Sequence, residues 1–366
     1  MPTMREPALL FVIAGQSNAA GKAVPELSPA ELQRIAVVSD RVTVVLGEPV
    51  PPTDDPRLRA GRFRLLERAA PPFAASPDLL LGLHLAEHWP DRRIVLLKRC
   101  MLGTSLAGSW NVAWDAARAQ RLEPKFCGAT GLYQALVADV QALERDEVVE
   151  IRGVVWVQGE RDIAVADEGI CAEAADAYED SLRALIRALR TDLADGRDLP
   201  VCTVAVSTAK YAESPAGFSQ REAGRDTPKA KVVRALRTVA ATEPAVHFLP
   251  DGDGDTSSEF FLPRLADHTH FDSEGMRRLG TRLAKVLCDE LDSEIRIEED
   301  VASHTITPRF QVFGGGVCVG GRGRGCCQAD RPPAIEPCRQ HAHSRCSHGA
   351  RRFPVGEPRT YLSFSS

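Results

Sequence analysis

Long apolar segments are missing from this 366-residue sequence, since no run approaches the roughly 20 residues that a membrane-spanning helix needs. A basic excess is missing too: the formal net charge is −5, which argues against general nucleic-acid binding. We expect no secretory signal, because the apolar stretch at residues 8–14 is short and runs directly into a motif suited to chemistry. We therefore expect a cytoplasmic protein with no nucleic-acid or membrane partner, in an oligomeric state that the sequence leaves open.

Ten cysteines are present, but their spacing does not indicate a disulfide framework. Five of them are scattered singly, in apolar surroundings, over the first 300 residues: Cys100, Cys127, Cys171, Cys202 and Cys288. We interpret these five as buried, reduced thiols that pack as small hydrophobic side chains. The other five lie within the last 50 residues, where the composition changes.

Apolar runs alternate with amphipathic stretches through most of the chain. The apolar runs are continuous, which is typical of strands covered on both faces of a sheet. Candidate strands are Leu9–Ala14, Val42–Leu46, Ile94–Lys98, Ile151–Val157, Val201–Val206 and Val246–Leu249. Candidate helices are Pro77–His88, Gly131–Leu143, Ala172–Leu193, Lys229–Ala241 and Ser273–Leu291. This alternation predicts an α/β fold, a three-layer α/β/α sandwich with a mainly parallel, flavodoxin-like doubly wound sheet.

Two regions depart from the pattern. Residues 23–75 include a stretch rich in proline and aspartate, and we interpret them as a long loop region that contributes to the rim of the site. Residues 301–366 are rich in glycine, arginine and cysteine, contain no lysine and have few candidate core residues. Such a segment buries too little apolar surface to offset its ordering entropy. We predict a catalytic domain over residues 1–300 and a disordered tail over residues 301–366.

A candidate nucleophile follows the first predicted strand. In doubly wound sheets, ligands bind beyond the carboxyl ends of the strands. There the sequence reads Gly15-Gln16-Ser17-Asn18, which places a serine among small residues on a sharp turn. Its hydroxyl is then presented at the sheet edge, with backbone N–H groups facing a bound anion. The structural alternative is that Ser17 only caps a helix.

Two other strand ends offer hydrogen-bond donors. Gly103 follows the strand predicted at 94–98, and a glycine there lets the backbone approach a ligand and donate its N–H. Gln158 ends the strand predicted at 151–157 and would direct its amide into the same crevice, with Glu160 and Asp162 close behind. The alternative for Gly103 is a simple turn.

A candidate base precedes the last predicted helix. Asp267 and His270 are three residues apart, so the carboxylate can hold the imidazole while the other ring nitrogen takes a proton from a serine. His268 is a rival base, and an Asx turn with a surface histidine is the structural alternative. Because nucleophile, base and donors all fall at predicted strand ends, we expect the fold to gather them into one active site.

The sequence resembles the SGNH-hydrolase superfamily, within it the branch of sialate O-acetylesterases and carbohydrate esterase family 6 acetyl-xylan esterases. The resemblance spans roughly residues 8–290. It rests on Gly15-Gln16-Ser17-Asn18, on Gly103-Thr104-Ser105-Leu106 with Trp110, on Trp156-Val157-Gln158-Gly159-Glu160, and on Asp267–His270 with Leu279–Ala284.

The resemblance implies a serine esterase that removes acetyl groups from a carbohydrate or a similar hydroxylated substrate through an acyl-enzyme. It implies Ser17 as nucleophile, His270 as base and Asp267 as its partner, with no metal or organic cofactor. The implied oxyanion hole consists of the N–H groups of Ser17 and Gly103 and the side-chain amide of Gln158. Neighbouring motif residues are candidates for substrate binding: Gln16, Asn18, Thr104, Trp110 and Glu160.

Three positions differ from residues common in that family: Ala19 replaces methionine, Leu102 replaces glycine and Val157 replaces histidine. None removes a catalytic group, although Leu102 is large enough to narrow the site. Two alternatives stay open. One is a carbohydrate-binding or scaffold protein of the same fold without turnover, and the other is an SGNH esterase or lipase acting on other acyl esters.

Overall fold

The structure is a computed structural model that describes residues 6–49, 53–55, 58–125, 128–206, 226–252, 256–267 and 269–304. The chain divides into two compact units, 1–306 and 307–366, and the description concerns the first. The predicted disorder of the tail falls outside the described residues, except that the last helix continues through residues 301–304. That helix therefore crosses the predicted domain boundary at residue 300.

A seven-stranded sheet forms the centre of the described part of the chain, in the order β3-β2-β4-β1-β5-β6-β7. The neighbouring strands are parallel except at the edge, where β3 runs antiparallel to β2. The strands are β1 (Ala8–Gly15), β2 (Val42–Leu46), β3 (Gly61–Arg64), β4 (Ile94–Cys100), β5 (Val149–Val157), β6 (Val201–Val204) and β7 (Val246–Leu249). The order differs from the simplest flavodoxin-like order in that β4 is inserted between β1 and β2.

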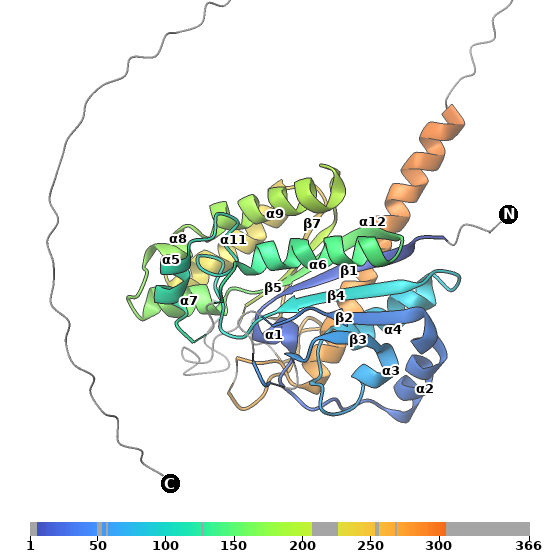
Figure 1. Cartoon of the computed structure of the whole chain (residues 1–366), viewed down its shortest axis with the longest axis horizontal. Coiled ribbons are helices and arrows are strands. Elements are labelled where there is room, and N and C mark those ends of the chain that lie inside the picture. Colours follow the sequence, from blue (N-terminus) through green and yellow to red (C-terminus); the bar gives the residue numbers. More distant parts are fainter. Residues whose placement is uncertain are drawn as a thin grey trace, which may run out of the picture. The chain divides into compact units, whose positions relative to one another are not determined.

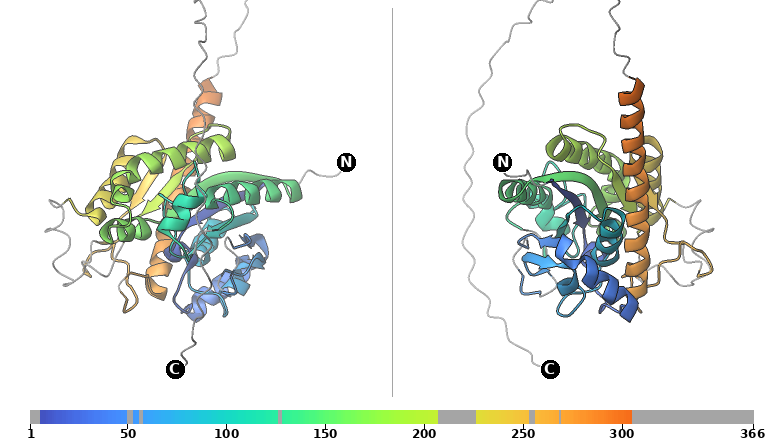
Figure 2. Two further views of the ribbon diagram at one scale, coloured as in Figure 1. Left: turned by 60° about the vertical axis from the view of Figure 1, so that its left-hand side comes forward. Right: turned by 90° about the vertical axis from the view of Figure 1, so that its right-hand side faces the viewer.

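Helices cover both faces of the sheet, which confirms the predicted three-layer α/β architecture (Figures 1 and 2). On one face α4 and α12 pack against each other, and on the other lie α6, α9 and α11. The helices are α1 (Ser17–Ala20), α2 (Pro29–Val38), α3 (Leu65–Arg68), α4 (Asp78–His88), α5 (Ala116–Leu122), α6 (Leu132–Asp146), α7 (Glu160–Asp167), α8 (Glu173–Asp176), α9 (Tyr178–Ala194), α11 (Pro228–Thr242) and α12 (Ser273–His304), with a 3-10 turn at Ser39–Arg41. None of the helices in the described ranges combines the length and apolar character that a membrane span requires.

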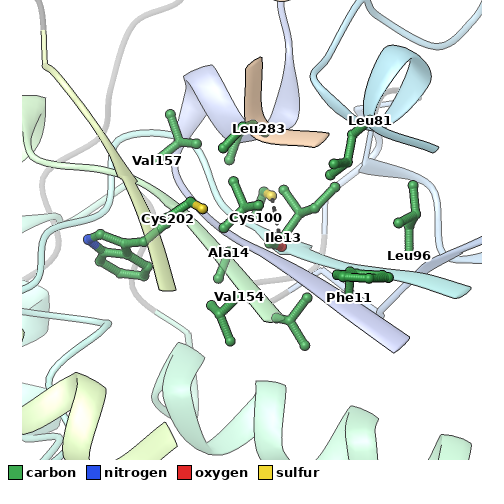
Figure 3. Packing of buried hydrophobic residues seen from close by; sticks show 14 of the residues in the cluster. Phe11, Ile13, Ala14, Leu81, Leu96, Cys100, Val154, Val157, Cys202 and Leu283 are labelled. Carbon is green, nitrogen blue, oxygen red and sulfur yellow. Dashed lines mark hydrogen bonds between the residues drawn. The ribbon is translucent and has the colours of Figure 1, made fainter. Parts of the chain in front are cut away.

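The core explains why the central strands read as continuous apolar runs. Every residue of β1 and β4 is buried, because helices cover both sides of these strands. Figure 3 shows Ile13 of β1 directed toward Leu81 of α4, with Leu283 of α12 close by. Four of the five scattered cysteines are buried and free, as predicted, namely Cys100, Cys171, Cys202 and Cys288. Cys127 lies outside the described residues.

The region at 23–75 is not the long loop that we predicted. It contains α2, β2, β3 and α3, and β3 pairs with β2 at the edge of the sheet. A capping box at Ser28 and Glu31, with Pro29 in the first turn, starts α2. The predicted helix at 172–193 is also corrected, because the structure divides it at Ala177 into α8 and α9.

Candidate active site

Ser17 lies at the carboxyl end of the central strand β1, as the first residue of the one-turn helix α1. The turn is possible because Gly15 has no side chain: a Cβ there would lie 2.1 Å from the carbonyl oxygen of Val157, and its φ of 141° favours glycine. The amides of Ala19 and Ala20 bond back to the Gln16 carbonyl and hold the turn. From β1 the chain continues to β2 on one side of this strand, whereas β5 on its other side leads on to β6 and β7. Ser17 therefore lies at the topological switch point, where ligands bind in such folds.

The predicted meeting of Ser17 and His270 is present. The Ser17 hydroxyl lies 2.9 Å from Nε2 of His270, although 253 positions separate the two residues in the chain. Nδ1 of the same imidazole lies 2.8 Å from a carboxylate oxygen of Asp267. This chain of contacts runs from hydroxyl to imidazole to carboxylate, the arrangement that activates a serine for nucleophilic attack. The rival base, His268, lies outside the described residues.

Asp267 is held in its charged form by several donors. Its Oδ1 accepts the backbone N–H groups of Thr269 and His270, and its Oδ2 accepts the Lys22 ammonium at 2.7 Å. Partial burial opposes ionisation, but the hydrogen bonds from Lys22 and His270 outweigh it and hold the pKa of Asp267 well below its usual range. The carboxylate can therefore orient the imidazole and stabilise its protonated form.

A cavity of about 330 Å³ opens beside this relay. Five of the residues predicted for the site line it: Gln16, Ser17, Gly103, Glu160 and His270. It is also lined by residues to which we had assigned no site role: Lys22, Leu102, Arg161, Ala164 and Thr269. Lys22 and Arg161 were missed although each lies within a few residues of a motif, because a surface cation near a strand end is common. Leu102 was flagged only as a departure from the family pattern.

Two residues of the cavity wall have backbone N–H groups that were predicted to form the oxyanion hole. Gly103 follows β4 with a φ of 63° and contributes to the cavity wall, as does Ser17. Within the described ranges, neither of their N–H groups has a hydrogen-bond acceptor. Both groups are therefore available to stabilise a negative oxygen next to the Ser17 hydroxyl.

Gln158, the third predicted oxyanion donor, forms its hydrogen bonds within the protein. Its side chain is fully buried and does not line the cavity. Its amide nitrogen lies 2.6 Å from Oδ2 of Asp162, 3.1 Å from the Thr104 carbonyl and 3.3 Å from Oε1 of Gln16, so acceptors of the protein surround the amide. The Tyr178 hydroxyl donates to the amide oxygen at 3.0 Å and fixes its orientation. The role of Gln158 as an oxyanion donor stays a prediction, and the contacts of its amide in this structure are with the protein.

The candidates for substrate binding divide into two groups. Gln16 and Glu160 line the cavity, whereas Asn18, Thr104 and Trp110 are completely buried and do not. The buried three form hydrogen bonds within the protein, such as the bond from Trp110 Nε1 to Thr104 Oγ1. They therefore shape the site without reaching a ligand.

Glu160 is the buried acid of the cavity wall. One carboxylate oxygen accepts the Asn18 amide at 2.7 Å, and the other has no partner in the described part of the chain. Burial raises the pKa of Glu160 to about 7. The group thus changes protonation state near neutral pH, beside the position that a substrate would occupy. No cluster of three or more potential metal ligands occurs among the described residues.

Residues 7–289 match the family described as carbohydrate esterase, sialic acid-specific acetylesterase. The chain belongs to this family. The match covers all the motifs that carried the resemblance, and it classes the chain with carboxylic ester hydrolases that act on carbohydrates. Among curated protein sequences, none matches the chain significantly.

Several solved structures are similar to this acetylesterase family member. One is a protein from Arabidopsis thaliana that is 18% identical, with a TM-score of 0.52, and the match covers 78% of this chain and 99% of the other. A carbohydrate acetylesterase from Xanthomonas citri is 18% identical, with a TM-score of 0.49, over 76% of this chain and 55% of the other. The protein NanS is 17% identical, with a TM-score of 0.47, over 79% and 100%. At these identities the likeness concerns the fold alone.

Proposed function

We propose that this protein is a serine acetylesterase that removes acetyl groups from a carbohydrate or a similar hydroxylated compound. The observation that carries the proposal is the relay from Ser17 through His270 to Asp267, with contacts of 2.9 and 2.8 Å, at the wall of a cavity. A protein that only binds carbohydrate needs no such relay. Family membership supports the class of reaction.

In the proposed mechanism, His270 takes the proton of Ser17 as the serine oxygen attacks the ester carbonyl. The carbonyl oxygen becomes negative and is stabilised by the N–H groups of Ser17 and Gly103. His270 then donates its proton to the departing alcohol, and an acetyl-enzyme remains. A water molecule, deprotonated by His270, attacks this ester and releases acetate. Asp267 stays ionised throughout and stabilises the imidazolium.

The cavity supports a small acyl group. Leu102 and Ala164 contribute apolar surface to its wall, and the volume of about 330 Å³ lies at the small end of the range for ligand pockets. We therefore expect acetyl esters to be cleaved faster than butyryl esters, and octanoyl esters slowest. A preference for octanoyl esters would instead favour a lipase-like enzyme of the same superfamily.

The decisive test is replacement of the nucleophile. Ser17→Ala removes the attacking oxygen, so hydrolysis of p-nitrophenyl acetate is expected to fall by at least about 10³-fold, to the background rate. Labelling of the protein by a fluorophosphonate probe should also disappear. Ser293→Ala, on the exposed surface of α12, is the matched control and should keep both properties. Wild-type activity in the Ser17→Ala variant would refute the proposal, and an unlabelled, inactive wild type would indicate a binding protein.

A further inference from the structure

The loop that follows β4 is held by two buried carboxylates that the mechanism does not use. Gly103 begins this loop, and the residues after it, from Thr104 to Trp110, are almost completely buried. The N–H groups of Leu106 and Ala107 donate to the two oxygens of Asp162, both at 2.9 Å. The backbone N–H groups of Ser105 and Ser109 in the same loop donate to Glu123. Four amides of the loop thus donate to carboxylates.

Asp162 connects this loop to the end of β5. It lies in the first turn of α7, and its Oδ2 accepts both the Leu106 amide and, at 2.6 Å, the Gln158 side chain. The same Gln158 nitrogen donates to the carbonyl of Thr104, directly after Gly103. Asp162 therefore fixes the loop beyond Gly103 in two ways, through its own hydrogen bonds and through the orientation of Gln158.

Glu123 holds the far end of the loop. Its carboxylate accepts the amide of Ser105 at 3.2 Å and that of Ser109 at 2.5 Å. It also lies directly against the backbone, since a Cβ added to Gly108 would be 1.9 Å from Oε1 of Glu123. Glycine at residue 108 is what allows this approach.

A structural role alone is a poor explanation for this arrangement. Neither carboxylate forms an ion pair with a lysine or arginine in the described ranges, so only hydrogen bonds compensate its burial. Burial raises the pKa of Asp162 to about 6 and that of Glu123 to about 8, which means that the charged forms carry an energetic cost. Departures from the usual rules of burial are expected at functional sites. Gly103, at the start of this loop, lines the cavity. The two carboxylates thus hold the loop that carries this backbone donor.

We propose that Asp162, with Glu123, is a positioning residue that fixes the loop so that the Gly103 N–H is aimed at the developing oxyanion before substrate binds. This inference rests on the proposed esterase function. A donor that is already in place needs no reorganisation during the reaction, and a donor displaced by about 1 Å loses most of its effect. Asp162 acts through Gly103 and touches no substrate.

The test is Asp162→Asn, a substitution of equal size. In the variant, an NH₂ group replaces one carboxylate oxygen and meets an amide donor from which it cannot accept. The asparagine therefore cannot accept from both loop amides and from Gln158 at once. We expect kcat on p-nitrophenyl acetate to fall by about 30- to 300-fold while KM stays within about threefold. The affinity for phenylboronic acid, which forms a tetrahedral adduct with the serine, should fall in parallel. Amide exchange of Leu106 and Ala107 should become faster.

Asp192→Asn is the matched control. This carboxylate also accepts a partly buried hydrogen bond, from the Tyr133 hydroxyl at 2.5 Å. It lies near the end of α9, about 20 Å along the helix from Tyr178, which contacts Gln158 at the site. It should leave kcat, KM and boronate affinity within about twofold of wild type.

The outcomes separate this inference from the function itself. A wild type without esterase activity refutes the proposed function, whatever the variants do. With an active wild type, the inference is wrong if Asp162→Asn keeps kcat within threefold, or if kcat falls while boronate affinity stays unchanged. If Asp162→Asn does not fold, Glu123→Met decides, because it keeps the size of the side chain but removes both acceptors of the serine amides. A fall of at least fivefold in both kcat and boronate affinity then supports the inference, and unchanged values overturn it.

Discussion

At the scale of single residues, Asn18 links the segment that carries Ser17 to the segment that carries His270. Its side-chain nitrogen donates to Glu160 and to the carbonyl of Thr269, and its oxygen accepts the N–H of Phe271 at 3.1 Å. The two backbone contacts flank His270 on both sides. A residue adjacent to the nucleophile thus sets the position of the base, which explains how a hydroxyl and an imidazole so distant in sequence meet at hydrogen-bonding distance.

Replacement of Asn18 by alanine should therefore affect both stability and turnover. The change leaves a buried amide, a carbonyl and the Glu160 carboxylate without this partner, so the free energy of unfolding should fall by about 2–4 kcal/mol. The value of kcat should fall by about tenfold or more, because His270 loses its anchors. Urea unfolding and steady-state kinetics measure the two effects. Asn111→Ala, at a surface turn, should change neither, and equal behaviour of the two variants would contradict the bridging role.

The difference between Gln158 and Ser17 shows which part of the site a sequence can reveal. Ser17 is recognisable because a serine on a turn after a strand has one plausible orientation. Gln158 was also correctly placed at a strand end, yet its amide is used by Thr104 and Asp162. Glu123 belongs to no motif and lies far from Asp162 in sequence. Which acceptors surround a buried amide depends on tertiary packing, and local pattern contains no information about it.

Strands were predicted best where a short run rich in apolar residues stops abruptly in the sequence. The strands at Val42–Leu46 and Val246–Leu249 have the predicted bounds, because apolar residues end where the sheet ends. The short edge strand β3, Gly61–Arg64, was missed since alternate residues point to solvent and two of its four residues are arginines. Helix α2 was missed although its capping box is a local signal that sequence inspection can detect.

The capping box of α2 offers a test at the scale of one element. The Ser28 hydroxyl accepts the amide of Glu31 at 3.2 Å, and Glu31 accepts the Ser28 amide at 2.8 Å. Ser28→Ala should lower the free energy of unfolding by about 1 kcal/mol, whereas Ser28→Thr, which keeps the hydroxyl that donates to Glu31, should retain most of the stability. Neither variant should change kcat, because α2 does not line the cavity. Equal stabilities of the alanine and threonine variants would show that the cap does not hold the helix.

At the scale of the whole molecule, the buried acids around the active site oppose stability at neutral pH. Three of them have a raised pKa, mainly because of burial: Asp162 at about 6, Glu160 at about 7 and Glu123 at about 8. All three contribute to the cavity wall or to the loop beneath it. Burial of these three acids at the site thus lowers the free energy of unfolding.

The sign of the resulting pH dependence follows from these values. The ordinary pKa values are 3.8 for Asp162 and 4.5 for the two glutamates, so in the pH window above them the folded protein holds more protons than the unfolded chain. These three acids therefore lower the stability as the pH rises, until the pH passes about 8. Burial lowers the pKa values of His84 and Lys98, so these two groups contribute in the opposite direction. Asp78 and Asp267 have lowered pKa values, so their contributions change only in more acidic solution.

We therefore expect the free energy of unfolding in urea to decrease steadily from pH 5.5 to pH 8.5. Glu123→Gln resembles the protonated acid and has no charge to desolvate, so its stability should fall less steeply over the same range. Asp192→Asn, whose carboxylate lies far from this cluster, should retain the wild-type slope. Stability that rises with pH, or a Glu123→Gln slope equal to that of wild type, would mean that these carboxylates are not the strained groups that their burial indicates.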